Sequence, residues 1–182
     1  GTASWARTGL LVLTHPRRVW RTVRVDHASG AGLAWTNSAL TAFLFILWIA
    51  VPGIVPRSWG FVMNAGFVVF FALFFGVAAL CWIESLGIRF YGARNKWRVT
   101  SEVAATVVGH ASYGWLLLPL SVPFFWFFAS LGFGRALGGS SDLGALGAAL
   151  TTIALIAGPG VPLLAFEILV YIGFRRMRYA NP

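Results

Sequence analysis

The fold is decided by residues 84–102, ESLGIRFYGARNKWRVTSE, a charged stretch that separates two long apolar ones. Its ionisable residues are four bases with one acid at each end, namely Glu84, Arg89, Arg94, Lys96, Arg98 and Glu102. Residues 58–83 and 103–134, on either side, contain no Asp, Glu, Lys or Arg. One small soluble domain cannot bury that much apolar surface, whereas a lipid bilayer accommodates such runs as spanning helices. We therefore expect residues 84–102 to form a water-exposed loop between two membrane-spanning helices.

The composition of the whole chain points to the same class of protein. Of its 182 residues, 58% are hydrophobic and 10% are charged, against about 25% charged in soluble domains. The net charge of +9 would by itself fit a nucleic-acid-binding protein. The basic residues, however, adjoin the apolar runs, where they face the anionic head groups of lipids. We therefore predict an all-α polytopic transmembrane bundle whose partner is the lipid bilayer and not nucleic acid.

The chain divides into a basic N-terminal segment, residues 1–34, and a transmembrane domain, residues 35–182. Within the first, residues 4–14 are apolar but too short to cross a membrane. A short amphipathic helix is expected over residues 16–25, because Pro16 suits the first turn of a helix. Residues 29–33, SGAGL, are expected to be a flexible link.

The helix over residues 16–25 separates arginines from apolar side chains. The arginines are Arg17, Arg18, Arg21 and Arg24, and the apolar residues are Val19, Trp20 and Val23. This division is typical of a helix that lies in the head-group layer of a membrane. The alternative is a helix that packs on another subunit.

Four apolar segments follow along the chain, and we expect four crossings. The first two cover residues 35–51 and 59–83, and the second holds Ala72 and Gly76 at a spacing that lets helices approach closely. Residues 103–134 and 143–174 are longer than a bilayer requires.

The two longer segments contain residues that interrupt helices. Pro119 and Pro123 lie in the third, and Gly158-Pro159-Gly160 lies in the fourth. Each segment is expected to be one kinked span or a broken one, so that five or six crossings remain as alternatives.

The basic residues predict the orientation of the bundle. Twelve of the fourteen fall in residues 1–34, 84–101 and 174–182, and the other two are Arg57 and Arg135. With four crossings the three rich stretches share one side, so the positive-inside rule places both termini in the cytoplasm. Arg94, Arg98, Arg175 and Arg176 are among the residues expected to set this topology. The excess of Arg over Lys favours a bacterial source, and hence the inner membrane.

Two ionisable residues lie deep inside the predicted spans and are candidate functional residues. His110 follows Glu102 by eight residues, and Glu167 precedes Arg175 by eight. Each is therefore about 12 Å from the cytoplasmic end, at about 1.5 Å per residue. The pair is interpreted either as a proton-linked or substrate-binding site or, as we favour, as a hydrogen bond between helices worth about 1 kcal/mol or less.

Other sites of chemistry are not indicated. The chain has one cysteine, Cys81, which excludes a disulfide framework and a cysteine zinc site. A haem would need a second histidine at membrane depth, and His15 and His27 lie outside the spans, so no cofactor is expected. No nucleotide-binding loop, nucleophile–base pair or metal motif is present in the sequence. Asn37, near the start of the first span, is interpreted as a cap or an interfacial group.

Several residue patterns resemble those of bacterial Yip1-domain membrane proteins. These are Pro16 among aromatic and basic residues, Glu84-Ser-Leu-Gly before a basic Gly/Trp stretch, and residues 109–115, GHASYGW, shortly after Ser101-Glu102. The resemblance implies a helical bundle of about five spans that acts through partners and not as an enzyme. The family has no catalytic residues to carry over to this chain.

Two functions from different classes follow. The first is a non-enzymatic accessory subunit or scaffold that packs against other membrane-protein subunits. The alternative is a small proton-coupled transporter or carrier that uses His110 and Glu167.

Overall fold

The computed structural model describes residues 2–49, 59–136 and 141–177, and within these ranges all regular structure is helical. The elements in chain order are α1 (Thr2–Thr14), α2 (Pro16–Val19), α3 (His27–Ile49), α4 (Trp59–Arg94), α5 (Ser101–Ala111), the 3₁₀ helix η1 (Ser112–Leu117), α6 (Leu118–Ala136) and α7 (Ser141–Met177). The all-α fold predicted from the sequence is confirmed. A loop is expected from the sequence over residues 132–142, but α6 continues to Ala136 and α7 begins at Ser141. Residues 50–58, 137–140 and 178–182, which include Arg57 and Arg178, lie outside the described residues.

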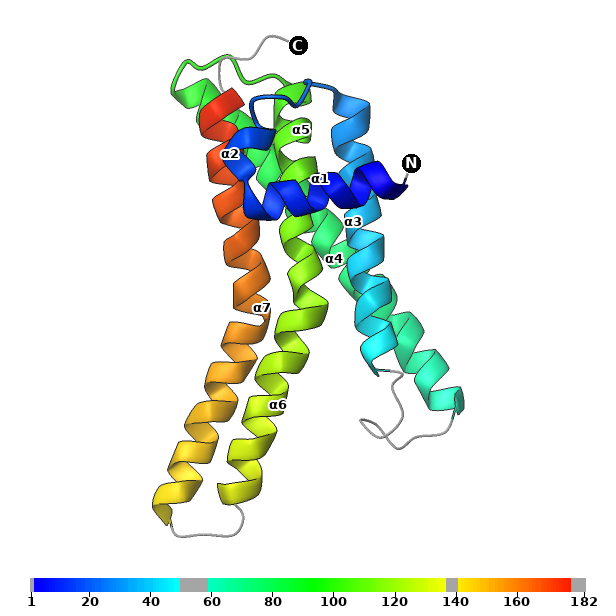
Figure 1. The fold of residues 1–182 in the computed structure, drawn as a ribbon, viewed down its shortest axis with the longest axis vertical. Coiled ribbons are helices and arrows are strands. Elements are labelled where there is room, and N and C mark those ends of the chain that lie inside the picture. The colour runs from blue at the N-terminus through cyan, green and yellow to red at the C-terminus, as the bar shows by residue number, and fades with distance from the viewer. Residues whose placement is uncertain (1, 50–58, 137–140, 178–182) are drawn as a thin grey trace.

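Four helical stretches in the described ranges are long and apolar enough to cross a membrane, namely Ala28–Trp48, Asn64–Arg94, Ser101–Phe127 and Gly147–Met177. They run alongside one another, and α1 lies near the end of the bundle at which α7 ends (Figure 1). Large apolar side chains such as Phe67, Phe71 and Phe75 are exposed on the outer surface. Such a surface suits lipid and not water, so the chain is a multi-pass membrane protein.

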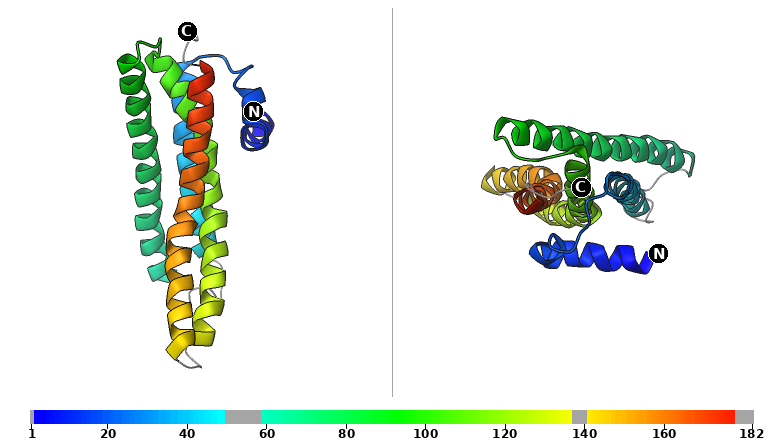
Figure 2. Two further views of the ribbon diagram at one scale, coloured as in Figure 1. Left: turned by 90° about the vertical axis from the view of Figure 1, so that its left-hand side faces the viewer. Right: turned by 90° about the horizontal axis from the view of Figure 1, so that it is seen from above.

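The helices form three layers when the molecule is seen from above, from the end at which α7 ends (Figure 2). α1 lies crosswise over one face, α4 covers the opposite face, and α3, α7 and the α5–η1–α6 rod lie between them. The core of the bundle follows α5 and η1, where Val103, Val107 and Tyr113 are fully buried. This arrangement decides which side chains of the middle layer face α1 and which face α4.

The third apolar segment is one continuous helical rod. The sequence predicts an irregularity in it, and the structure shows this irregularity as the 3₁₀ helix η1. Pro119 and Pro123 lack backbone N–H groups and cannot bond to residues 115 and 119. The tighter 3₁₀ geometry at residues 112–117 lies directly before them. The rod therefore changes its winding at η1 without breaking.

The fourth apolar segment does not break at residues 158–160, because α7 runs through Pro159 and Pro162. Pro162 has no N–H to donate to the carbonyl of Gly158, four residues earlier. Ser121 of α6 donates its hydroxyl to that carbonyl instead, at 2.6 Å. A neighbouring helix thus satisfies the freed carbonyl, as the apolar interior of a membrane requires.

Helix α3 begins at His27, so the expected flexible link at residues 29–33 and the expected span start near residue 35 were wrong. The Asp26 carboxylate caps the helix by accepting from the backbone N–H groups of Ala28 (3.1 Å) and Ser29 (3.3 Å). The hydroxyl of Thr106 on α5 accepts from the Asp26 N–H (3.0 Å) and donates to its carbonyl (3.2 Å). The domain boundary expected between residues 34 and 35 therefore falls inside a helix.

The glycine at position 30 serves close packing and not flexibility. A Cβ atom at Gly30 would overlap the backbone of Ala105 on α5, and one at Gly109 would overlap the carbonyl of Gly30. Helices α3 and α5 thus touch backbone to backbone at this point. Glycine is the residue that lets two helices approach so closely.

The basic segment before α3 separates arginines from apolar side chains as expected from the sequence, but its helix is shorter. Arg17, Arg18, Arg21 and Arg24 are exposed, and Val19 and Trp20 are buried. Helix α2 covers only Pro16–Val19, because the chain then turns toward the Asp26 cap through bonds from Arg21 N to Arg18 O and from Thr22 N to Val19 O.

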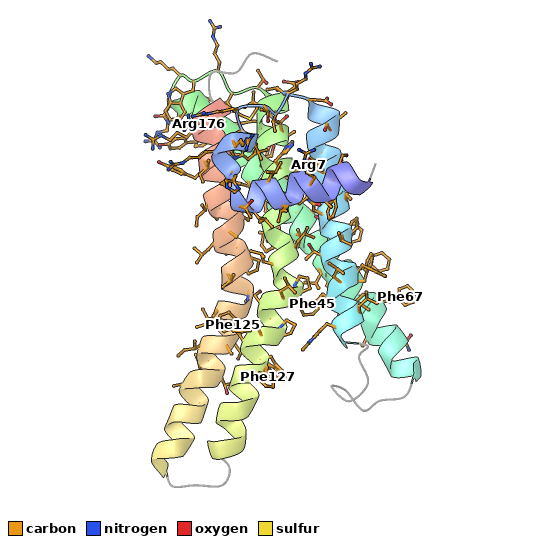
Figure 3. The ribbon with its side chains drawn as sticks, viewed as in Figure 1. Arg7, Phe45, Phe67, Phe125, Phe127 and Arg176 are labelled. Carbon is orange, nitrogen blue, oxygen red and sulfur yellow. The ribbon has the colours of Figure 1, made fainter. Side chains whose placement is uncertain are left out.

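The charged stretch 84–102 is mostly helical, so the expected loop shortens to residues 95–100. Helix α4 continues to Arg94 and ends in a turn in which Lys96 adopts a left-handed φ of 57°. Thr100 caps α5 by accepting from Val103 N (3.4 Å), and Glu102 stands in its first turn. The ends of α4 and α7 lie at the same end of the bundle, where nitrogen-bearing side chains gather (Figure 3).

Candidate functional site

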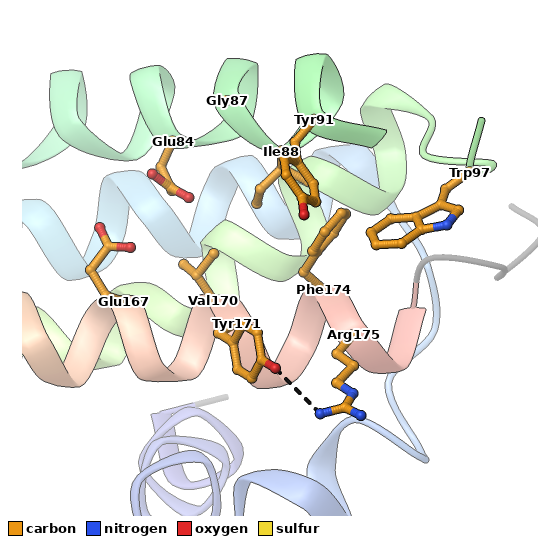
Figure 4. Close-up of a pocket in the computed structure, with 10 residues that line it drawn as sticks. All are labelled: Glu84, Gly87, Ile88, Tyr91, Trp97, Glu167, Val170, Tyr171, Phe174 and Arg175. Carbon is orange, nitrogen blue, oxygen red and sulfur yellow. Dashed lines mark hydrogen bonds between the residues drawn. The ribbon is translucent and has the colours of Figure 1, made fainter. Parts of the chain in front are cut away.

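His110 and Glu167, which were expected to share one site, lie on opposite faces of the middle layer. His110 is buried, donates from Nδ1 to the Thr106 carbonyl (2.9 Å) and has its ring 5.6 Å from that of Trp20, on the α1–α2 side. Glu167 is exposed and faces α4 (Figure 4). No hydrogen bond or ion pair joins these two described residues. A count of residues along each span does not give the rotation of each helix about its axis.

The polar residues near His110 serve the packing of α1 and α3. Thr106 holds the Asp26 cap, as described above. Tyr113 is fully buried and donates its hydroxyl to the Trp5 carbonyl of α1 at 3.1 Å. The buried polar residues of α5 and η1 therefore hold neighbouring helices in place.

A buried hydrogen-bond network ties α1 to α3 and η1, and the sequence did not reveal it. The Trp5 indole N–H donates to Asn37 Oδ1 (3.1 Å), and Asn37 Nδ2 donates to Ser112 Oγ (2.8 Å). Ser112 in turn donates to the Gly109 carbonyl (2.6 Å). Asn37 is fully buried, so its interpretation as a cap or interfacial group was wrong. Only the position of α1 across the bundle explains why this polar residue stands inside a span.

The candidate functional site is a groove between α4 and α7, with a volume of about 560 Å³. α4 packs mainly against α3 and α5, whereas α7 packs mainly against α5, η1 and α6, so the facing sides of α4 and α7 are left apart. Glu84 projects from α4 and Glu167 from α7, and the two carboxylates point toward each other across the groove (Figure 4). The sequence indicates Glu167 as a candidate, whereas Glu84 is interpreted from it as a boundary residue at the end of the second span, because the helix is expected to end there.

Aromatic side chains close the groove toward the basic end of the bundle. The Trp97 ring lies 5.7 Å from Tyr91 and 5.4 Å from Phe174, measured between ring centroids. Arg175 donates from a guanidinium nitrogen to the Tyr171 hydroxyl at 3.3 Å. Aromatic rings and an arginine are typical of the head-group level of a membrane. The two carboxylates therefore lie deeper in the membrane than this aromatic end.

The electrostatics of the groove favour a cationic occupant. Glu84 and Glu167 face each other across the groove (Figure 4), and two ionised carboxylates repel each other strongly where little water screens them. Among the residues placed in the structure, no Lys or Arg forms an ion pair with either carboxylate, and Arg175 bonds to Tyr171 instead. An ammonium or guanidinium group between the two carboxylates would remove this repulsion.

A metal centre is not assembled by the described part of the chain. No three His, Cys, Asp or Glu side chains come close enough together there to hold a metal ion. Cys81 is buried in the core beside the middle layer. The groove with its two carboxylates is therefore the candidate ligand-binding site.

Comparison with known proteins gives no match, whether with family models, curated proteins or solved structures. The groove and the surfaces of the bundle are therefore the features that bear on the function of the chain.

Proposed function

We propose that the protein is a non-enzymatic integral membrane subunit that assembles with another membrane protein by receiving one of its transmembrane helices in the α4–α7 groove. The observation that carries this proposal is the pair of carboxylates, Glu84 and Glu167, that face each other across an apolar groove. We place the protein in the bacterial inner membrane with both termini in the cytoplasm, which the positive-inside rule favours. Action through partners also agrees with the resemblance to Yip1-domain proteins.

A helix that carries one Arg or Lys fits this groove. Charged side chains at membrane depth are expensive unless they pair, and the partner's cation would meet a carboxylate from each wall. Glu84 lies ten residues before Arg94, and Glu167 eight before Arg175, so the cation would lie about 12–15 Å below the basic end.

The outer face of α4 supplies room for the partner's backbone. Ala72, Gly76 and Gly87 fall within one narrow sector of the helix, by the angle of about 100° per residue. All three are exposed, and a Cβ atom at Gly76 or Gly87 would meet nothing within 4 Å. Among the described residues, none therefore packs against Gly76 or Gly87, and this small-residue face remains open to another helix.

The alternative function, a proton-coupled carrier, depended on a meeting of His110 and Glu167. The structure turns the two residues to opposite faces of the bundle, as described above. The geometry therefore favours assembly over the carrier.

The proposal is tested by binding of a designed helix to the purified full chain in lipid nanodiscs. The probe is a poly-leucine transmembrane peptide with a single Arg about 12–15 Å from one end, and its matched control has Gln at that position. By fluorescence energy transfer, the Arg peptide is expected to bind at least about tenfold more tightly, which corresponds to about 1.4 kcal/mol.

Variants assign that preference to the groove. Glu84→Gln with Glu167→Gln should abolish the preference for the Arg peptide, whereas Asp142→Asn, near the other end of α7, should keep it. Gly87→Leu should block both peptides, and Gly32→Leu, at another open glycine position, should not. Equal binding of the Arg and Gln peptides to the wild-type chain would refute the proposal.

A further inference from the structure

A second cavity lies on the opposite side of the molecule, at the corner where α1 meets α2. It measures about 540 Å³, and its lining includes Thr14, His15, Arg17, Arg18 and Arg21. We propose that this cavity is a binding site for the phosphate group of an anionic phospholipid. The site is independent of the α4–α7 groove, because α1 and α4 cover opposite faces of the bundle (Figure 2).

The charge of the cavity suits a phosphate. Three arginines line it, and no acid appears among the described residues that line it. Asp26, the acid that is nearest in the sequence, caps α3, and Glu84 and Glu167 face the other groove. Arginine is suited to phosphate because its planar group donates two parallel hydrogen bonds to the oxygens.

The walls of the cavity are held in place by contacts beneath them. Thr14 donates its hydroxyl to the Leu10 carbonyl (2.7 Å), and His15 Nδ1 lies 2.9 Å from the Thr14 hydroxyl oxygen. Trp20 is buried between His110 and α7, where a Cβ atom at Gly173 would come within 2.7 Å of its ring. The arginines thus extend from a fixed corner of the backbone and not from a loose chain end.

A lipid fits the surroundings of the cavity better than a free phosphate ion. Leu10 and Leu13, on the last turns of α1, expose 64% and 38% of their surfaces beside the basic residues. α1 lies crosswise to the spanning helices and near the end of the bundle at which α7 ends (Figure 1). An occupant with a phosphate and an acyl chain satisfies the arginines and the leucines together, whereas phosphate alone satisfies only the arginines.

The test compares two triple variants of the full chain in detergent, with lipid binding followed by native mass spectrometry. Arg17→Gln, Arg18→Gln and Arg21→Gln together should lower the retention of phosphatidylglycerol at least about tenfold. Arg89→Gln, Arg94→Gln and Arg98→Gln remove the same charge from exposed positions at the α4–α5 end and should lower it less than about threefold. All six residues are exposed, so both variants should fold. Equal losses in the two variants would overturn the proposal, because they would show attraction by net charge alone.

A second pair of measurements separates the lipid from free phosphate. Leu10→Ser with Leu13→Ser should weaken phosphatidylglycerol binding although every arginine is kept. Inorganic phosphate and glycerol phosphate should fail to displace the lipid at concentrations equal to it. Displacement by inorganic phosphate, together with no effect of the leucine changes, would identify a site for a soluble anion and contradict the proposed lipid site.

Discussion

Gly30→Ala and Gly109→Ala should each destabilise the bundle by about 3 kcal/mol, which is at the upper end of the usual cost of overpacking. Each new methyl group would have to occupy space already filled by the backbone of the facing helix. A backbone cannot rotate aside as a side chain does, so α3 and α5 would have to separate. Their separation would also strain the hydrogen bonds between Thr106 and Asp26, the residue that caps α3.

Gly32→Ala is the matched control for this prediction. Gly32 lies in the same helix, two residues from Gly30, but a Cβ atom there would meet nothing within 4 Å. Alanine at a free helical position stabilises by up to about 1 kcal/mol relative to glycine. In a mild detergent, the melting temperature of Gly32→Ala should therefore equal or exceed that of the wild type. The melting temperatures of Gly30→Ala and Gly109→Ala should lie well below it. Equal melting temperatures for Gly30→Ala and Gly32→Ala would refute the close contact of α3 and α5.

Asn37→Leu should loosen α1 from the bundle. The substitution keeps a similar volume but removes the acceptor of the Trp5 indole N–H and the donor to Ser112. Hydrogen bonds between membrane helices contribute about 0.6–1.7 kcal/mol, and an unpaired buried group costs about 1–3 kcal/mol. Hydrogen exchange of the α1 amides should therefore accelerate roughly tenfold, while exchange in α6 should be unchanged.

Two further variants show whether the network is the cause. Ser38→Ala changes the neighbouring buried residue, whose hydroxyl donates only to the Ala34 carbonyl of its own helix (2.7 Å), so α1 should keep its protection. Trp5→Phe should reproduce the effect of Asn37→Leu, and the double variant should add little, because both remove the same bond. Strictly additive effects would show that Trp5 and Asn37 act separately.

The parts of the fold that the sequence predicts are those set by chain length, hydropathy and charge. The four spans and the exposed arginines of the N-terminal segment follow from the spacing of apolar and basic residues. None of these depends on which helix is the neighbour of which.

The features that the sequence did not predict all depend on contacts between distant segments. Gly30 was interpreted as a flexible residue because the approach of α5 cannot be seen locally. The break expected at residues 158–160 does not occur, since Ser121 on another helix satisfies the freed carbonyl. The pairing of Glu84 with Glu167, in place of His110 with Glu167, depends on how α4, α5 and α7 are rotated about their axes.

The central claim, that four spans bring the α4–α5 connection and the end of α7 to one side of the membrane, is tested most directly by cysteine labelling. The native Cys81 is first replaced by Ser, and single cysteines are introduced at Asn95, Ser141 and Arg176. An impermeant maleimide should label Asn95→Cys and Arg176→Cys only in inside-out bacterial membrane vesicles, and Ser141→Cys only in right-side-out vesicles. Labelling of the cysteines at positions 95 and 176 from opposite sides would contradict the four-span arrangement.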